Sequence, residues 1–401
     1  MNSTQLLILG NGFDLHCGLR SSYKDFFHSE ILYSIVEPFG VKKLKAGVLG
    51  FWESLLLEYY KTNNKDDYAW CDIETIIKDT LWLILIGDNA KLNQGLAYEA
   101  LICIESGGEI NNDALRKSST VVKFILNYCY DFFAINNLNI TDGVSLLIAH
   151  LFQELKNLEK RFCKYLKNQI VNPYNENEKN EEYIIKAVNL LAALTGFAHY
   201  KFDKIDDFIT VESKNYLISV FDNLDNVFIL NFNYTALFDV LEVESPCYYN
   251  NVHGKLCNNK CGKDCKASDV IFGIDDNLIQ TQGASSELRL FSKTYRKMFI
   301  YGDPIIILPP NDNNPIKIKF YGHSLSEADY SYFQSIFDYY DLYGNSNVSL
   351  TFYYSNGFEN HDAVYKLISA YGKSLTNKEQ GKNLLHKLLL ENRLHIQEVR
   401  N

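Results

Sequence analysis

Short apolar runs that end in turn residues recur at the start of the chain and in its last 180 residues. Each run is followed by glycine, asparagine, aspartate or histidine, as expected where buried parallel strands end. Because the first run cannot form a sheet alone, we expect it to pair with the later ones. The predicted strands are Leu6–Leu9, Val227–Leu230, Tyr248–Gly254, Val270–Asp275, Ile316–Gly322 and Val348–Tyr354.

The region between these strands, from about Val41 to about Asp222, has the period of amphipathic helices. Apolar residues recur at i+3 and i+4 between Phe51 and Tyr60, and again from Asp142 to Leu166. Asp72 is a predicted N-cap. We therefore predict an α/β protein with a Rossmann-like, mostly parallel sheet and a large helical insertion. The predicted boundaries are residues 1–30 and 221–375 for the core, 31–220 for the insertion and 376–401 for a C-terminal helix.

Composition narrows the function classes. The net charge is −10 and no long basic stretch occurs, so nucleic acid is an unlikely partner. Apolar runs are too short for a signal peptide or a membrane span. Nine cysteines, mostly in apolar runs, fit reduced buried thiols. We expect a soluble, cytoplasmic protein with no membrane partner.

The turn after the first strand, Gly10-Asn11-Gly12-Phe13-Asp14, has the form of a phosphate-binding turn. Glycine allows a backbone N–H to approach a ligand closely. However, Leu15 stands where the dinucleotide fingerprint has its third glycine, and an ordinary tight turn is the alternative. A helix capped by Ser21 or Ser22 is expected to follow.

Asn233 and His253 are the strongest catalytic candidates, because each follows a different predicted strand. An amide can orient a sugar hydroxyl or a water, and a histidine of ordinary pKa near 6.5 suits a general base. The alternative is structural, with Asn233 capping a helix begun at Thr235 and His253 bonded within a loop.

The segment Gly322–Asp329 has two interpretations. Ser324 and Glu327 form a capping box, which predicts a helix N-terminus at the ligand edge. Alternatively, Gly322-x-Ser324-x-Ser326 resembles a nucleophile elbow with Ser324 attacking. The other members of such a hydrolase triad would be Asp338 or Asp362 with His361 or His386.

Two further motifs carry weaker chemistry. Cys257, Cys261 and Cys265, with Cys247 as a possible fourth ligand, suggest a zinc knuckle or a metal-free loop. Asn356 follows the last predicted strand, where a ribose or adenine edge often binds. A simple turn is the alternative there.

Taken in order, these motifs resemble the AbiH family of bacteriophage abortive infection proteins. The residues that carry the resemblance are Leu7–Asp14, Ser22–Phe26, Trp70–Glu74, Asn231–Thr235, Val252–Gly254 and Gly322–Asp329. The resemblance implies an antiphage defence protein, with a phage protein as a possible trigger and a homo-oligomer as a possible assembly.

The same motif order distantly resembles the sirtuin (SIR2-like) pattern, which implies a bound NAD. By that resemblance Gly10 and Gly12 hold the pyrophosphate, Asn233 lies beside the nicotinamide ribose and His253 is catalytic. Asp14, Asn231 and Thr235 depart from the sirtuin pattern, and the three cysteines occupy the place of its zinc module. The cofactor-binding residues implied are Gly10, Asn11, Gly12, Phe13, Gly322, His323, Ser324 and Asn356.

These expectations combine into hydrolysis of the N-glycosidic bond of NAD or a related nucleotide. The reaction passes through a ribosyl cation, so the site must shield that cation and place one water. Asn233 would orient the water or the ribose, His253 would accept a proton, and Asp14 would stabilise positive charge or receive a hydroxyl proton. The alternative class is a nucleotide-binding sensor that has no catalytic activity.

Overall fold

A computed structural model describes most of the chain. The described residues are 3–32, 36–37, 40–41, 49–62, 72–86, 95–107, 118–170, 178–196, 226–235, 247–256, 270–275, 286–299, 308–312, 314–355 and 361–399. The chain divides into two compact units. The first comprises Met1–Ser22, Leu166–Val270 and Ile300–Asn401, and the second comprises Tyr23–Tyr165 and Ile271–Phe299.

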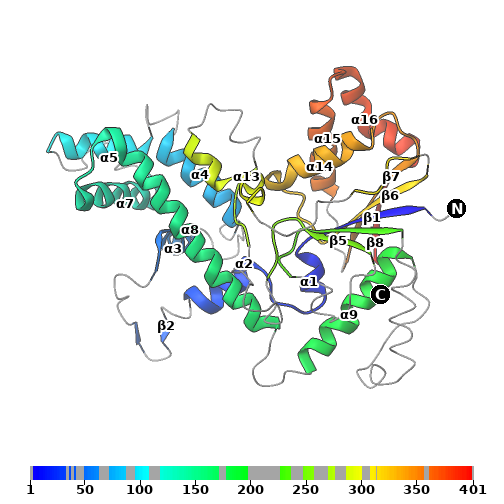
Figure 1. Cartoon of the computed structure of the whole chain (residues 1–401), viewed down its shortest axis with the longest axis horizontal. Coiled ribbons are helices and arrows are strands. Elements are labelled where there is room, and N and C mark those ends of the chain that lie inside the picture. Colours follow the sequence, from blue (N-terminus) through cyan, green and yellow to red (C-terminus); the bar gives the residue numbers. More distant parts are fainter. Residues whose placement is uncertain are drawn as a thin grey trace. The chain divides into compact units, whose positions relative to one another are not determined.

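A six-stranded parallel sheet organises the first unit (Figure 1). Its strands lie in the order β5-β4-β1-β6-β7-β8, which in chain order is 3-2-1-4-5-6, the order of a Rossmann fold. The predicted α/β, Rossmann-like class is therefore confirmed. The strands are β1 (Thr4–Leu9), β4 (Val227–Asn231), β5 (Tyr248–Asn251), β6 (Ile316–Tyr321), β7 (Val348–Tyr354) and β8 (Leu394–Glu398).

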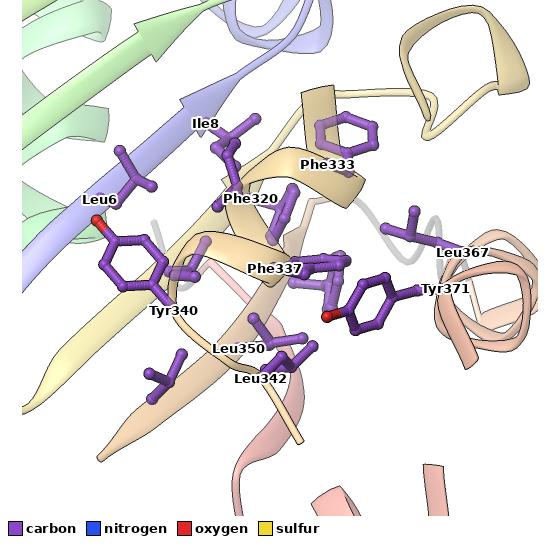
Figure 2. Packing of buried hydrophobic residues seen from close by; sticks show 14 of the residues in the cluster. Leu6, Ile8, Phe320, Phe333, Phe337, Tyr340, Leu342, Leu350, Leu367 and Tyr371 are labelled. Atoms are coloured by element: carbon purple, nitrogen blue, oxygen red, sulfur yellow. The ribbon is translucent and has the colours of Figure 1, made fainter. Parts of the chain in front are cut away.

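Strand β1 is apolar on both faces because helices cover both faces of the sheet. Leu7 and Leu9 pack against α9 (Glu178–Thr195) on one face. On the other face Leu6 and Ile8 join a core with side chains such as Phe333 and Tyr371 (Figure 2). The helices behind that core are α14 (Tyr330–Tyr339), α15 (His361–Ser374) and α16 (Lys378–Leu390).

The helical prediction for the middle of the chain is confirmed in the second unit. Asp72 caps α4 by accepting a hydrogen bond from the Thr75 N–H at 3.1 Å. The helix expected over 142–166 is the centre of α8. The described elements are α2 (Tyr23–Phe26), the π-helix η1 (Phe27–Leu32), β2 (Val36–Glu37), β3 (Gly40–Val41), α3 (Phe51–Thr62), α4 (Ile73–Leu85), α5 (Leu96–Glu105), α7 (Thr120–Asn136), α8 (Ile140–Ile170), the 3₁₀ helix η4 (Ser286–Phe291) and α13 (Lys293–Lys297).

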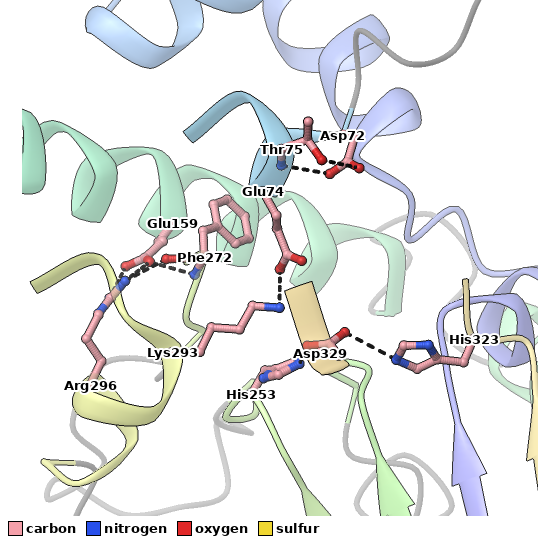
Figure 3. Close-up of polar contacts among 10 residues, drawn as sticks. All are labelled: Asp72, Glu74, Thr75, Glu159, His253, Phe272, Lys293, Arg296, His323 and Asp329. Atoms are coloured by element: carbon pink, nitrogen blue, oxygen red, sulfur yellow. Dashed lines mark hydrogen bonds and ion pairs between the residues drawn. The ribbon is translucent and has the colours of Figure 1, made fainter. Parts of the chain in front are cut away.

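Two buried ion pairs explain why residues 271–299 belong to the helical unit (Figure 3). The Lys293 ammonium lies 2.7 Å from the Glu74 carboxylate of α4. The Arg296 guanidinium binds both carboxylate oxygens of Glu159 on α8, at 2.6 and 2.7 Å. These pairs connect a late segment of sequence to early helices.

Two predictions about elements are corrected. Residues Val270–Asp275 are not a sheet strand, because Ile274 makes only an isolated bridge to Ser292. The predicted C-terminal helix over 376–401 is α16 followed by β8, whose alternating apolar and polar residues are typical of a half-exposed edge strand. The two compact units have other bounds than the predicted domains, since Leu166–Val270 groups with the sheet, and the domain boundaries stay a prediction.

Candidate functional site

The turns after β1 and β6 touch each other at the carboxyl edge of the sheet. The Gly10 N–H donates to Tyr321 O at 2.9 Å, and the Gly12 N–H donates to Gly322 O at 2.8 Å. A Cβ on Gly10 would lie 2.3 Å from the Cα of His323. Gly322 has φ +70°, which favours glycine. The glycines are thus required by contact between two backbone turns.

This contact occupies amides that a phosphate-binding turn would use. Besides Gly10 and Gly12, the Phe13 N–H donates to Gly10 O at 2.9 Å, and Asn11 accepts from the Ser21 hydroxyl at 2.5 Å. Helix α1 (Gly12–His16) begins inside the turn and has only five residues, and the helix expected after Ser21 or Ser22 is α2. A phosphate here would need other donors, so cofactor binding by this turn stays a prediction.

Asp14 is a buried carboxyl group with two hydroxyl partners. It is 1% exposed, and it accepts hydrogen bonds from Thr235 Oγ1 at 2.6 Å and from the Tyr183 hydroxyl at 3.0 Å. Burial raises its pKa to about 6, although both hydrogen bonds oppose the shift. A carboxyl that titrates this close to neutrality can exchange a proton or carry charge. Tyr183 comes from α9, and no sequence signal links it to Asp14.

Asn233 lies at the centre of a network of amides after β4. Its Nδ2 donates to Gly10 O at 3.0 Å, and its backbone N–H donates to Asn231 Oδ1 at 3.1 Å. Asn251, the register partner of Asn231, donates to Asn233 O at 2.7 Å. Among the described residues nothing donates to the buried Asn233 Oδ1. The alternative in which Asn233 caps a helix involves residues after Thr235 that lie outside the described residues.

His253 belongs to a cluster of two histidines around one carboxylate (Figure 3). Its Nε2 lies 2.8 Å from Asp329 Oδ1, and Nε2 of His323 lies 3.3 Å from Asp329 Oδ2. The Phe232 ring packs edge-on against both imidazoles, with centroid distances of 5.2 and 4.7 Å. Asp329 ends the 3₁₀ helix η5 (Glu327–Asp329) and was not predicted as a site residue, although it lies in the Gly322–Asp329 segment.

The three predicted catalytic residues therefore belong to one edge of the sheet. Asp14 accepts a hydrogen bond from Thr235, which follows Asn233 by two residues. Asn233 in turn donates to the carbonyl of Gly10, in the turn that contains Asp14. His253 follows Asn251, which binds the Asn233 carbonyl, by two residues. All three side chains are buried.

Ser324 does not have its predicted capping role in this structure. The capping box is wrong, because η5 has Ser326 as its N-cap and α14 has Asp329, and neither helix start has a side-chain cap bond. Leu325 has φ 57°, so the chain turns sharply before the helix. In the part of the chain that the structure describes, no hydrogen bond joins the exposed Ser324 to a histidine. The nucleophile interpretation gains no support.

The predicted metal ligands and one nucleotide contact cannot be placed. Cys257, Cys261, Cys265 and Asn356 lie outside the described residues. Within the described ranges, no group of three histidine, cysteine or acidic side chains is arranged to hold a metal ion. The zinc site and the contact by Asn356 stay predictions.

None of the helices that the structure describes is both long enough and apolar enough to cross a membrane.

Comparison with known proteins identifies the family. The family model described as bacteriophage abortive infection AbiH matches residues 6–354, which include every described residue of the carboxyl-edge site. No curated protein and no solved structure matches the chain. The match confirms the resemblance drawn from the sequence motifs. The chain belongs to the AbiH family of bacteriophage abortive infection proteins.

Proposed function

We propose that this protein acts in antiphage defence by hydrolysing the N-glycosidic bond of NAD or a related nucleotide. Its family supports the abortive-infection role. The proposed chemistry belongs to the carboxyl edge of a parallel sheet in Rossmann order, which is where open α/β sheets bind nucleotides.

The observation that carries the proposal is the orphaned oxygen of Asn233. This atom is buried and accepts no hydrogen bond from the described residues. The amide orientation is supported by the bond from Nδ2 to Gly10 O, because a flipped amide would place two oxygens together. An unsatisfied buried acceptor costs about 1–3 kcal/mol. A ribose hydroxyl is a donor of the right kind to satisfy it.

The neighbouring groups fit the remaining steps. Water attacks the anomeric carbon, the glycosidic electron pair leaves with nicotinamide, and one water proton goes to His253. The ionised fraction of Asp14 stabilises the ribosyl cation, because its pKa of about 6 leaves most of it charged at pH 7. Nicotinamide leaves as a neutral molecule, so no strong general acid is required.

The test is release of nicotinamide from NAD by purified protein, with and without extract from phage-infected cells. We expect Asn233→Ala and His253→Ala each to reduce the rate by about 100-fold or more. Asn345→Ala is the matched control, since it removes a half-buried amide before β7 at the opposite edge of the sheet. Release at the wild-type rate by both site variants would refute the proposal.

Burial of the site favours a second candidate, a nucleotide sensor without turnover. Asp14, Asn233 and His253 are only 1%, 4% and 3% exposed, so substrate does not reach them without a structural change. A sensor would bind NAD in calorimetry without releasing nicotinamide. Its defence activity would survive His253→Ala but be lost in variants that abolish NAD binding.

A further inference from the structure

Each carboxylate oxygen of Asp329 lies close to the imidazole of a different histidine. Nε2 of His253 approaches Oδ1 at 2.8 Å, and Nε2 of His323 approaches Oδ2 at 3.3 Å. The side chains of His253 and His323 are each 4% exposed and that of Asp329 is 9% exposed, which excludes most competing water. Nε2 of His253 lies within ion-pair distance of Oδ1 without meeting hydrogen-bond geometry in this structure. Because an ionised carboxylate only accepts hydrogen bonds, it favours a proton on each nitrogen that faces it.

A backbone hydrogen bond independently determines which ring nitrogen of His323 carries the proton. The Leu325 N–H donates to His323 Nδ1 at 2.9 Å, so that nitrogen has no proton and Nε2 carries it. Leu325 reaches this position through a left-handed backbone with φ 57°, which costs a non-glycine residue about 1–2 kcal/mol. Strain of this kind persists where surrounding structure requires it.

We propose that Asp329 is a positioning residue that holds His253 in its Nε2–H tautomer, with His323 anchoring the second carboxylate oxygen. Nδ1 of His253 is then the nitrogen that gains a proton when His253 acts as a base. The resulting imidazolium is stabilised by the Asp329 carboxylate. Phe232 packs against both imidazole rings and restricts their rotation. The catalytic part of this inference rests on the proposed function, whereas the tautomers do not.

The tautomers can be measured without any activity. Protein labelled with ¹⁵N-histidine reports which imidazole nitrogen carries the proton, and His253→Gln and His323→Gln assign the signals by their loss. We expect Nε2–H for both residues in the wild-type protein. In Asp329→Asn we expect at least one of them to change, because an amide offers one oxygen and a donor in place of two acceptors. An Nδ1–H tautomer for wild-type His253, or unchanged signals in a folded Asp329→Asn protein, would overturn the inference.

Kinetics test the functional part. Asp329→Asn should lower kcat for nicotinamide release by about 10²–10⁴-fold with little change in KM, as expected when a base loses its orienting carboxylate. Asp341→Asn is the matched control, since Asp341 is exposed and has a left-handed backbone that asparagine tolerates. A wild-type kcat in Asp329→Asn contradicts positioning. If the wild-type protein releases no nicotinamide, the proposed function fails, and the tautomers still decide whether Asp329 orients His253.

Discussion

At the scale of the residue, ionisation of the buried Asp14 carboxyl group lowers the free energy of unfolding. Its carboxyl group has an ordinary pKa of 3.8, which burial raises to about 6 in the folded protein. Below pH 4 both folded and unfolded states are protonated, and the carboxyl group imposes no charge-burial cost. Between pH 4 and 6 only the folded state keeps the proton, so the free energy of unfolding falls as pH rises. The loss is complete above pH 6.

Asp14→Asn should remove this pH dependence. A rise in pKa from 3.8 to about 6 corresponds to about 3 kcal/mol, which the variant should recover in part at pH 7.5. An asparagine amide can still pair with the hydroxyls of Thr235 and Tyr183. Urea unfolding at pH 4.5 and 7.5 measures the effect, with the exposed Asp142→Asn as control. Equal pH slopes in Asp14→Asn and wild type would contradict the assignment.

The sequence predicts the site residues that directly follow recognisable strands, but not those whose partners are distant in the sequence. Asn233 and His253 follow visible strands, so their places at the sheet edge can be predicted from the apolar runs. Tyr183 and Asp329 meet their partners only after folding, across 169 and 76 positions of the chain. No local pattern encodes such contacts. Cofactor binding and the zinc site stay predictions.

At the scale of the element, the turn after β1 packs directly against the backbone of the turn after β6. A methyl group on Gly10 would overlap the backbone at His323 and Gly322. Gly10→Ala should therefore force the two turns apart and lower the free energy of unfolding by about 1–3 kcal/mol.

Gly143→Ala provides the comparison. Its Cβ would meet the Phe133 ring at 3.3 Å, but alanine favours the interior of α8 by up to about 1 kcal/mol, so we expect a near-neutral effect. Thermal melting of both variants and the ¹⁵N signal of His323 report stability and local geometry. A Gly10→Ala protein as stable as wild type, with an unmoved His323 signal, would contradict this close packing of the two turns.

Elements were predictable where one periodicity dominated. The mainly apolar strands β1 and β4 and the long α8 fit their sequence patterns well. Strand β8 was missed because it follows α16 after a short turn and only two of its five residues are apolar. Residues 270–275 read as a strand because their side chains are buried, yet their partners lie in the helical unit.

At the scale of the whole molecule, the ion pairs of the helical unit make a distant segment part of its core. Lys293 is 2% exposed and Glu74 13%. Glu74→Gln leaves a buried ammonium beside an uncharged amide and should destabilise the protein by about 3–5 kcal/mol. Adding Lys293→Met should recover much of that loss, because it removes the charge that Glu74→Gln leaves without its carboxylate.

Urea unfolding checks both variants, and Lys382→Ala supplies an exposed control pair. Lys382 and Glu379 are 69% and 76% exposed, so losing their contact should cost less than about 1 kcal/mol. If the single Glu74→Gln variant is no less stable than this control, the buried pair does not stabilise the protein as we expect. The predicted domain boundaries differ here because such pairing leaves no trace in local composition.

The antiphage role can be tested in cells. If chemistry at the carboxyl edge produces defence, phage should form plaques on cells that express His253→Ala or Asn233→Ala as readily as on cells without the protein. Cells with Asn345→Ala should stay protected. Immunoblots must show equal amounts of each variant. Protection by both site variants would favour docking or sensing over catalysis.

The central position of β1 has a consequence for biosynthesis. This strand leaves the ribosome before the other strands of its sheet, but its neighbours are β4, which starts at Val227, and β6, which ends at Tyr321. At about 5–20 residues per second, β1 waits roughly 15–60 seconds for its second neighbour. The turn that holds His323 forms only with that neighbour. A nascent chain therefore cannot assemble this site before His323 has left the ribosome.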